Sequence, residues 1–203
     1  MAVVRERGAS VDRQLIELAE KGDLAGVKTL LARGAHVEAR DKFQFTALIR
    51  AAKSSHLEVV RYLIEHAQAN VEARTHQGCT ALHWGVVGKD ARLVRYLVEE
   101  AKADAEATDD EGWTAVALGA SGGHLSSVRY LVERAGARYE FKDINGLTPL
   151  DLARKSFRQE MVAYLQDVRI EGVKRALHRD LGGLFMLHPM MLSCVDSSAS
   201  LCP

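Results

Sequence analysis

The chain has 203 residues, a length that fits one domain, and 47% of them are hydrophobic, enough to bury a sizeable core. Lysine and arginine together number 27, as do aspartate and glutamate, so the formal net charge is zero. A neutral chain has no long-range attraction to nucleic acid or to an anionic membrane, so we expect neither as a partner.

The N-terminus and the cysteines indicate the cellular compartment. Met1–Arg7 carries charges and lacks the apolar core of a signal peptide. No apolar stretch approaches the roughly 18 residues that a membrane-spanning helix needs. The three cysteines, Cys79, Cys194 and Cys202, are an odd number and make a poor disulfide framework. We therefore expect an intracellular protein, cytoplasmic or nuclear.

The first part of the chain is predicted to be a flexible N-terminus over residues 1–10, followed by a helical unit over residues 11–40. Gln14–Ala19 and the apolar positions of Leu24–Leu31 predict two short helices. The outer face of this unit is charged, as the end of a stack requires, because one of its faces meets water.

From residue 41 onward, three short phrases recur with one period. Four threonines open similar phrases at a constant interval, at Thr46, Thr80, Thr114 and Thr148. A Tyr-Leu phrase and a Val-Glu-Ala phrase keep the same interval. Three phrases in one register indicate a single structural unit that has been copied. The copies are placed at residues 41–74, 75–108, 109–142 and 143–167.

Each copy predicts two short helices and a turn. Threonine is a good helix N-cap, and Pro149 suits the first helical position. Gly78, Gly112 and Gly146 supply the turn before each later threonine. The first helices are expected to break near Ser54-Ser55, Gly88, Gly122-Gly123 and Ser156.

This pattern resembles the ankyrin repeat, which has two helices, a turn, a period of about 33 residues and a Thr-Pro-Leu-His-x-Ala signature. Asn145–Leu150 and Gly78–His83 match that signature closely, and the resemblance covers residues 11–167. It implies an all-α fold, an α-solenoid of stacked helix-turn-helix units joined by β-turn or hairpin connectors. One departure is Gln44, which stands where the turn glycine is expected, so we expect this copy to be less stable than the family pattern.

The period is lost beyond the repeats, in residues 168–203. Arg169–Leu181 is amphipathic and is predicted to be a capping helix. The apolar stretch Leu184–Leu192 and the residues after it are predicted to form a mostly irregular tail.

The sequence holds no pattern that indicates catalysis or a cofactor. It lacks His-Glu-x-x-His, Cys-x-x-Cys and the phosphate-loop motif, so we expect neither an enzyme nor a bound cofactor or metal. His83 is interpreted as a structural hydrogen-bonding residue, Cys79 as a surface thiol and Asp109–Glu111 as a solvated turn. The alternative is a zinc site at His188, Cys194 and Cys202.

The resemblance implies a partner-binding surface on the concave face and the turn tips. The candidate residues are aromatic or arginine side chains at turn-tip positions and on the exposed side of the first helices. The alternative is that each aromatic ring packs against its neighbouring unit, and for Trp84 the two interpretations are balanced. The candidates are Phe43, Phe45, Arg50, Trp84 and Trp113.

A rigid repeat surface without a chemical site favours a non-catalytic protein-interaction module. We expect an adaptor or scaffold that is monomeric by itself and binds another protein. One alternative is a regulatory or inhibitory subunit of an enzyme. Another is a substrate-recruiting subunit of a larger complex, such as a ubiquitin ligase, that docks through the apolar tail.

Overall fold

The structure, a computed structural model, describes the backbone of residues 2–180 and the side chains of residues 11–172. It divides into two compact units, Met1–Ala163 and Tyr164–Pro203. The apolar stretch 184–192 and the zinc-site alternative therefore lie outside the described residues.

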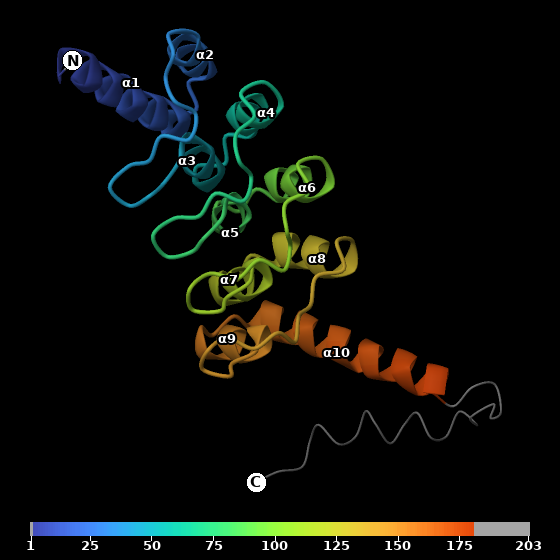
Figure 1. The fold of residues 1–203 in the computed structure, drawn as a ribbon. Helices are drawn as coiled ribbons and strands as arrows, with labels where there is room; N and C mark the ends of the chain where they lie inside the picture. The colour runs from blue at the N-terminus through green and yellow to red at the C-terminus, as the bar shows by residue number, and fades with distance from the viewer. Residues whose placement is uncertain (1, 181–203) are drawn as a thin grey trace. The chain divides into compact units, whose positions relative to one another are not determined.

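The described residues form helices in pairs, with no strand longer than the isolated bridge between Thr108 and Thr114. Figure 1 shows the pairs following one another along the first unit. This confirms the all-α repeat fold. The helices are α1 Ala2–Lys21, α2 Leu24–Ala32, α3 Ala47–Lys53, α4 Leu57–Glu65, α5 Ala81–Val87, α6 Ala91–Glu99, α7 Ala115–Gly122, α8 Leu125–Glu133, α9 Pro149–Lys155 and α10 Gln159–Asp180.

The repeated threonines begin the first helix of each pair from α3 onward. Thr46 Oγ1 accepts a hydrogen bond from the Ile49 amide at 3.3 Å, and the Thr114 hydroxyl accepts one at the same distance. Thr148 does the same and is joined by Asp151, whose carboxylate accepts from the Thr148 amide at 3.0 Å. The predicted capping role is confirmed, because these bonds satisfy amides that the first helical turn leaves unpaired.

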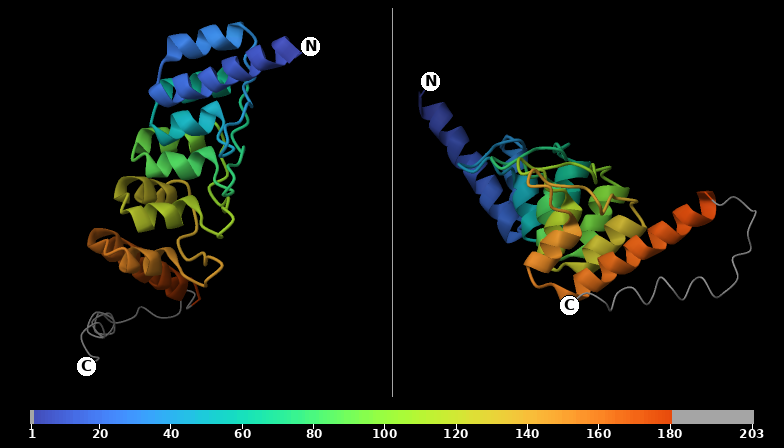
Figure 2. Two further views of the ribbon diagram at one scale, coloured as in Figure 1. Left: turned by 90° about the vertical axis from the view of Figure 1, so that its left-hand side faces the viewer. Right: turned by 90° about the horizontal axis from the view of Figure 1, so that it is seen from below.

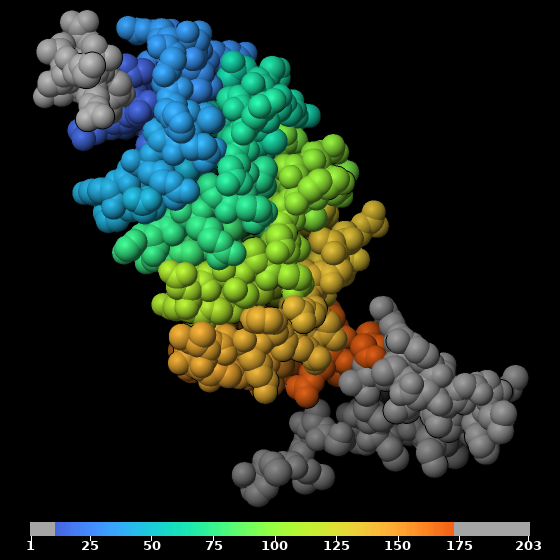
Figure 3. Space-filling model, viewed as in Figure 1, coloured from blue at the N-terminus to red at the C-terminus, as the bar shows by residue number. Residues whose placement is uncertain are grey.

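The first helices stack in one layer, in which α1 contacts α3, α3 contacts α5, α5 contacts α7, and α7 contacts α9. The second helices lie behind them, where α2 contacts α4 and α6 contacts α8. The loops gather on one side of the layers (Figure 2), and in the space-filling view successive pairs form adjacent bands (Figure 3). The core is repetitive too, since Val60, Val94 and Val128 are all fully buried.

Each loop folds into a tight turn that is bonded to the next one. In the first such turn, Asp41 Oδ1 accepts from the Phe43 amide at 2.8 Å and the Phe45 amide at 3.0 Å. The His76 amide of the next turn donates to the Phe43 carbonyl at 3.1 Å. Equivalent tip-to-tip bonds link the later turns, so the turn tips form a continuous ladder.

The two ends of the repeat region differ from the sequence prediction. The structure places residues 2–10 in helix α1, where we predicted a flexible N-terminus; this segment has no proline, and Gly8 is its single glycine. The second helix of the last copy and the predicted capping helix form one helix, α10, because no proline interrupts the chain between them. The repeat boundaries themselves remain a prediction.

Candidate functional site

Three of the candidate residues meet in an aromatic and cationic cluster between α3 and α5. The rings of Phe45 and Trp84 lie 5.2 Å apart between centroids, with an interplanar angle of 48°. The Arg50 guanidinium lies 4.3 Å from the Phe45 centroid. The Lys53 ammonium lies 4.7 Å from the centroid of the Trp84 ring. These contacts tie the second repeat to the third.

The expectation that Phe45 is a surface residue is wrong, because only 8% of it is exposed. Phe45 directly precedes Thr46, the N-cap residue of α3. At this position the side chain meets Arg50 and the Trp84 ring of the following repeat. Phe45 thus stabilises the junction between repeats.

Arg50 is held by two carboxylates as well as by the Phe45 ring. Its guanidinium pairs with Glu20 at 3.0 Å and, through Nε, donates to Asp41 Oδ2 at 3.1 Å. Burial alone would raise the pKa of Asp41, but hydrogen bonds from Arg50 and from turn amides outweigh it and lower the pKa overall. The carboxylate therefore stays charged, and Arg50 is paired within the chain.

Trp84 also lines a groove of about 320 Å³, where it lies together with a fourth candidate, Trp113. Trp84 comes from α5, and Trp113 precedes the cap of α7. Trp113 is oriented by its own indole Nε1, which donates to Asp143 Oδ2 at 3.0 Å. The groove is therefore preformed where the first helices meet the turn tips. It is lined by His76, Gln77, Cys79, Trp84, Val87, Asp109, Asp110, Glu111, Trp113 and Leu118.

Cys79, which lines this groove, is not the surface thiol that we expected, since 6% of it is exposed. Burial raises its pKa to about 12, and the negative charge of Asp109 adds to the effect. The side chain is therefore a neutral thiol near pH 7 and lacks the thiolate that a cysteine nucleophile needs.

His83 has the structural role predicted for it. Its Nδ1 lies 3.2 Å from the Thr80 amide, and its Nε2 lies 3.0 Å from the Trp113 carbonyl of the next repeat. The side chain is 1% exposed, and this burial lowers its pKa. The imidazole thus joins two repeats and is not open to a substrate.

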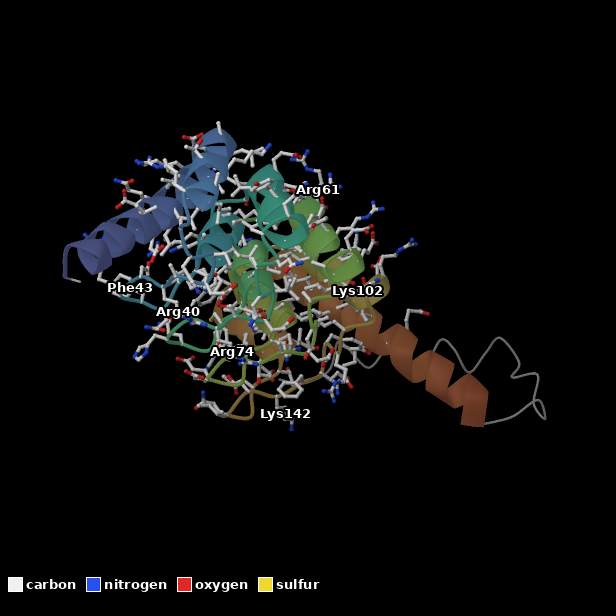
Figure 4. The ribbon with its side chains drawn as sticks, turned by 45° about the horizontal axis from the view of Figure 1, so that its top comes forward. Arg40, Phe43, Arg61, Arg74, Lys102 and Lys142 are labelled. Atoms are coloured by element: carbon white, nitrogen blue, oxygen red, sulfur yellow. The ribbon has the colours of Figure 1, made fainter. Side chains whose placement is uncertain are left out.

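Phe43 stands apart from the other candidates, at the tip of the first turn. It is 51% exposed, and the Lys42 ammonium lies 4.9 Å from its ring centroid. Figure 4 shows Phe43 with Arg40 and Arg74 along the loops, on the side away from Arg61. The five candidates therefore do not form one patch. Phe45 and Arg50 lie at the buried junction, Trp113 lies on the groove, Trp84 belongs to both, and Phe43 lies alone at the tip.

Sequence reasoning missed Lys53, which covers Trp84, and it interpreted Asp110 and Glu111 as an ordinary solvated turn. The structure places both acidic residues on the groove. The repeat period could have indicated that Asp110 and Glu111 lie on this surface. They occupy the positions one repeat after His76 and Gln77 at the preceding tip, which also line the groove.

A second groove, of about 680 Å³, lies between α1 and the first turn. It is lined by equal numbers of acidic and basic side chains, several of them paired with one another, so it offers no net charge to a ligand. Its lining is Asp12, Arg13, Ile16, Glu17, Glu20, Ala39, Arg40, Asp41, Lys42 and Arg50.

Within the part of the chain that the structure describes, no three histidine, cysteine or acidic side chains gather closely enough to hold a metal ion. No helix among the described residues has the length and apolarity needed to cross a membrane.

The stacked helix pairs, the threonine caps and the bonded turn tips define a helical-repeat protein whose surface is built from copies of one unit. The family described as ankyrin repeats (3 copies) matches residues 15–109 and 88–175. The chain belongs to the ankyrin-repeat family. Ankyrin repeats are in general protein–protein interaction modules.

A curated relative supports the same assignment. The ankyrin repeat domain-containing protein 49 of Bos taurus is 49% identical over 53 residues, which cover 26% of this chain and 22% of that protein. Because the match spans under a quarter of the relative, it supports membership of the family but indicates no particular partner.

Proposed function

We propose that this chain is a non-catalytic, intracellular adaptor or scaffold that binds another protein through the first-helix face and the turn tips. The observation that carries the proposal is the groove between Trp84 and Trp113. Two half-buried tryptophans from adjacent repeats line an open, preformed recess, and tryptophan is the residue type most enriched at binding hot spots.

The geometry also supports binding with little rearrangement. Asp143 fixes the Trp113 indole, and tip-to-tip hydrogen bonds fix the turns around it. A recess that is ordered before the partner arrives avoids the entropic cost of ordering side chains at the interface. Phe43, exposed at the first tip, extends the same surface toward the N-terminal repeats.

The proposal is tested with a partner that is first identified by affinity purification and mass spectrometry and then purified. Trp113→Ala should weaken its binding by about 2 kcal/mol or more in isothermal titration calorimetry, because it removes a central aromatic contact. The matched control is Leu147→Ala, which truncates an apolar side chain at the same position of the next repeat, outside this groove.

Thermal melts followed by circular dichroism separate binding from folding. Both variants should remain folded at the temperature of the titration. Equal affinity of the Trp113→Ala and Leu147→Ala variants for the partner would contradict the proposed binding site.

A further inference from the structure

The groove beside Trp113 occupies the same repeat positions as a cluster two repeats earlier. In that earlier cluster the space is filled by side chains of the chain itself. In the second repeat, Phe45, Asp41 and Arg50 form a compact set, with the guanidinium stacked on the ring and bonded to the carboxylate. The corresponding positions two repeats later are occupied by Trp113, Asp109 and Leu118.

The fourth repeat therefore keeps the aromatic ring and the carboxylate of this set but lacks its cation. Asp109 holds its turn as Asp41 does, accepting from the Trp113 amide at 2.8 Å. Leu118 stands where the arginine would be, and it lines the groove together with Trp113 and Asp109.

Three carboxylates line this groove. Asp109, Asp110 and Glu111 are consecutive carboxylates, and no lysine or arginine among the described residues lies within ion-pair distance of them. Asp110 and Glu111 are exposed at the tip, and Cys79, which also lines the groove, is a neutral thiol. A cation in the groove would offset this local negative charge.

The aromatic wall suits a planar cation. The Lys53 ammonium already lies 4.7 Å from the centroid of the Trp84 ring, so this indole attracts a cation within the fold. The Trp113 ring has no cation over it in the described part of the chain.

We propose that the groove between Trp84 and Trp113 receives one arginine side chain of the bound protein, in the manner of Arg50 on Phe45. The guanidinium stacks on Trp113 and pairs with the carboxylates of the turn. Arginine is favoured over lysine because its planar fork both stacks on aromatic rings and bonds to carboxylates in two places. This inference rests on the proposed function and names the chemistry of its partner.

The test uses blocked tripeptides and nuclear magnetic resonance. The chain has two tryptophans and hence two indole N–H resonances, both from the groove. Titration with acetyl-Gly-Arg-Gly-amide should shift both resonances to saturation. The peptide with citrulline, which has the shape of arginine without its charge, should leave them in place. A lysine peptide should bind more weakly than the arginine peptide, and added salt should weaken both.

Two sets of variants locate the binding. Asp110→Asn combined with Glu111→Gln should weaken the arginine peptide about tenfold or more, because the pairing charge is lost. Glu58→Gln, a matched control at an exposed position on α4, should leave its affinity unchanged. Leu118→Arg should abolish binding by supplying an internal guanidinium, whereas the neutral Leu118→Gln should retain it.

The outcomes separate this inference from the proposed function. Equal shifts with the arginine and citrulline peptides, or full affinity in the double charge variant, would overturn the arginine site. If partner binding still depended on Trp113 in that case, the protein-interaction proposal would stand. Specific binding of the arginine peptide without any Trp113-dependent partner would keep the arginine site and remove the proposed function.

Discussion

At the scale of single residues, the left-handed backbone positions recur with the period of the repeat. The turn before each first-helix cap has one such residue, at Gln44, Gly78, Gly112 and Gly146, with φ between 64° and 78°. Glycine adopts this conformation without strain, whereas a side chain with a Cβ does so at a cost. Gln44 is therefore a strained copy of a glycine turn, as its place in the sequence indicated.

We predict that Gln44→Gly raises the free energy of unfolding by about 0.5–1 kcal/mol, because relief of the strain exceeds the added freedom of the unfolded chain. Urea unfolding measures the change. The control is Gln14→Gly on the exposed face of α1, which should lower the stability by about 1 kcal/mol. Loss of stability in the Gln44 variant would show that the glutamine contributes a contact that offsets its strain.

At the scale of elements, a ladder of glutamates connects the loops of successive repeats. Glu38 Oε1 accepts from the Asn70 amide at 2.7 Å, and Glu72 Oε1 accepts from the Asp104 amide at 2.9 Å. Glu106 continues the series by accepting from an amide in the loop after α8. The repeated Val-Glu-Ala phrase thus has a physical role, which is to bond each loop to the next.

Glu72→Ala should lower the free energy of unfolding by about 1–2 kcal/mol, because the amide of Asp104 loses a charged acceptor. Glu100→Ala, at an exposed glutamate after α6, serves as the matched control and should change stability by less than about 0.5 kcal/mol. Similar losses in both variants would mean that the ladder contributes nothing specific.

The elements were predictable because their signals are local. Threonine caps and apolar spacing marked the beginning of each first helix from α3 onward. Burial was harder to predict, because the exposure of a side chain at a repeat junction depends on the residue that the next repeat places against it. Phe45 is covered because Trp84 occupies, one repeat later, the position of Arg50, and no pattern within one copy reveals that contact. The acidic residues Asp110 and Glu111 could have been found by comparing copies, because they occupy the positions of His76 and Gln77 one repeat earlier.

At the scale of the whole repeat stack, each helix packs mainly against helices of its own repeat or of an adjacent repeat. Stability in such a stack is the sum of terms for each repeat and for each junction. His83 belongs to a junction, since it links α5 to the Trp113 carbonyl. Burial lowers its pKa from the ordinary 6.5, so the folded state favours the neutral imidazole.

This makes the stability of the stack sensitive to mild acid. Below about pH 6.5 the unfolded chain binds a proton that folded His83 excludes, so the free energy of unfolding should fall between about pH 7 and pH 5. His124, whose pKa burial also lowers, acts in the same direction. Carboxylates with lowered pKa, such as those of Asp41 and Asp151, act at lower pH, because their contribution is lost progressively as the pH falls through their ordinary value of 3.8.

Urea unfolding over this pH range measures the effect, with His83→Gln as the comparison. The variant should be less stable at pH 7 and should show a shallower dependence on pH, because one of the two imidazoles with a lowered pKa is gone. An unchanged slope would assign the acid sensitivity to other groups.

The tip-to-tip bonds give every junction between turns the same backbone geometry, whatever side chains surround it. Excision or duplication of one repeat-length segment between corresponding turn positions rejoins amides and carbonyls that already match. The length of the protein and the chemistry that it recognises can therefore evolve separately: the first changes by whole segments, and the second by single substitutions such as the one that distinguishes position 118 from position 50.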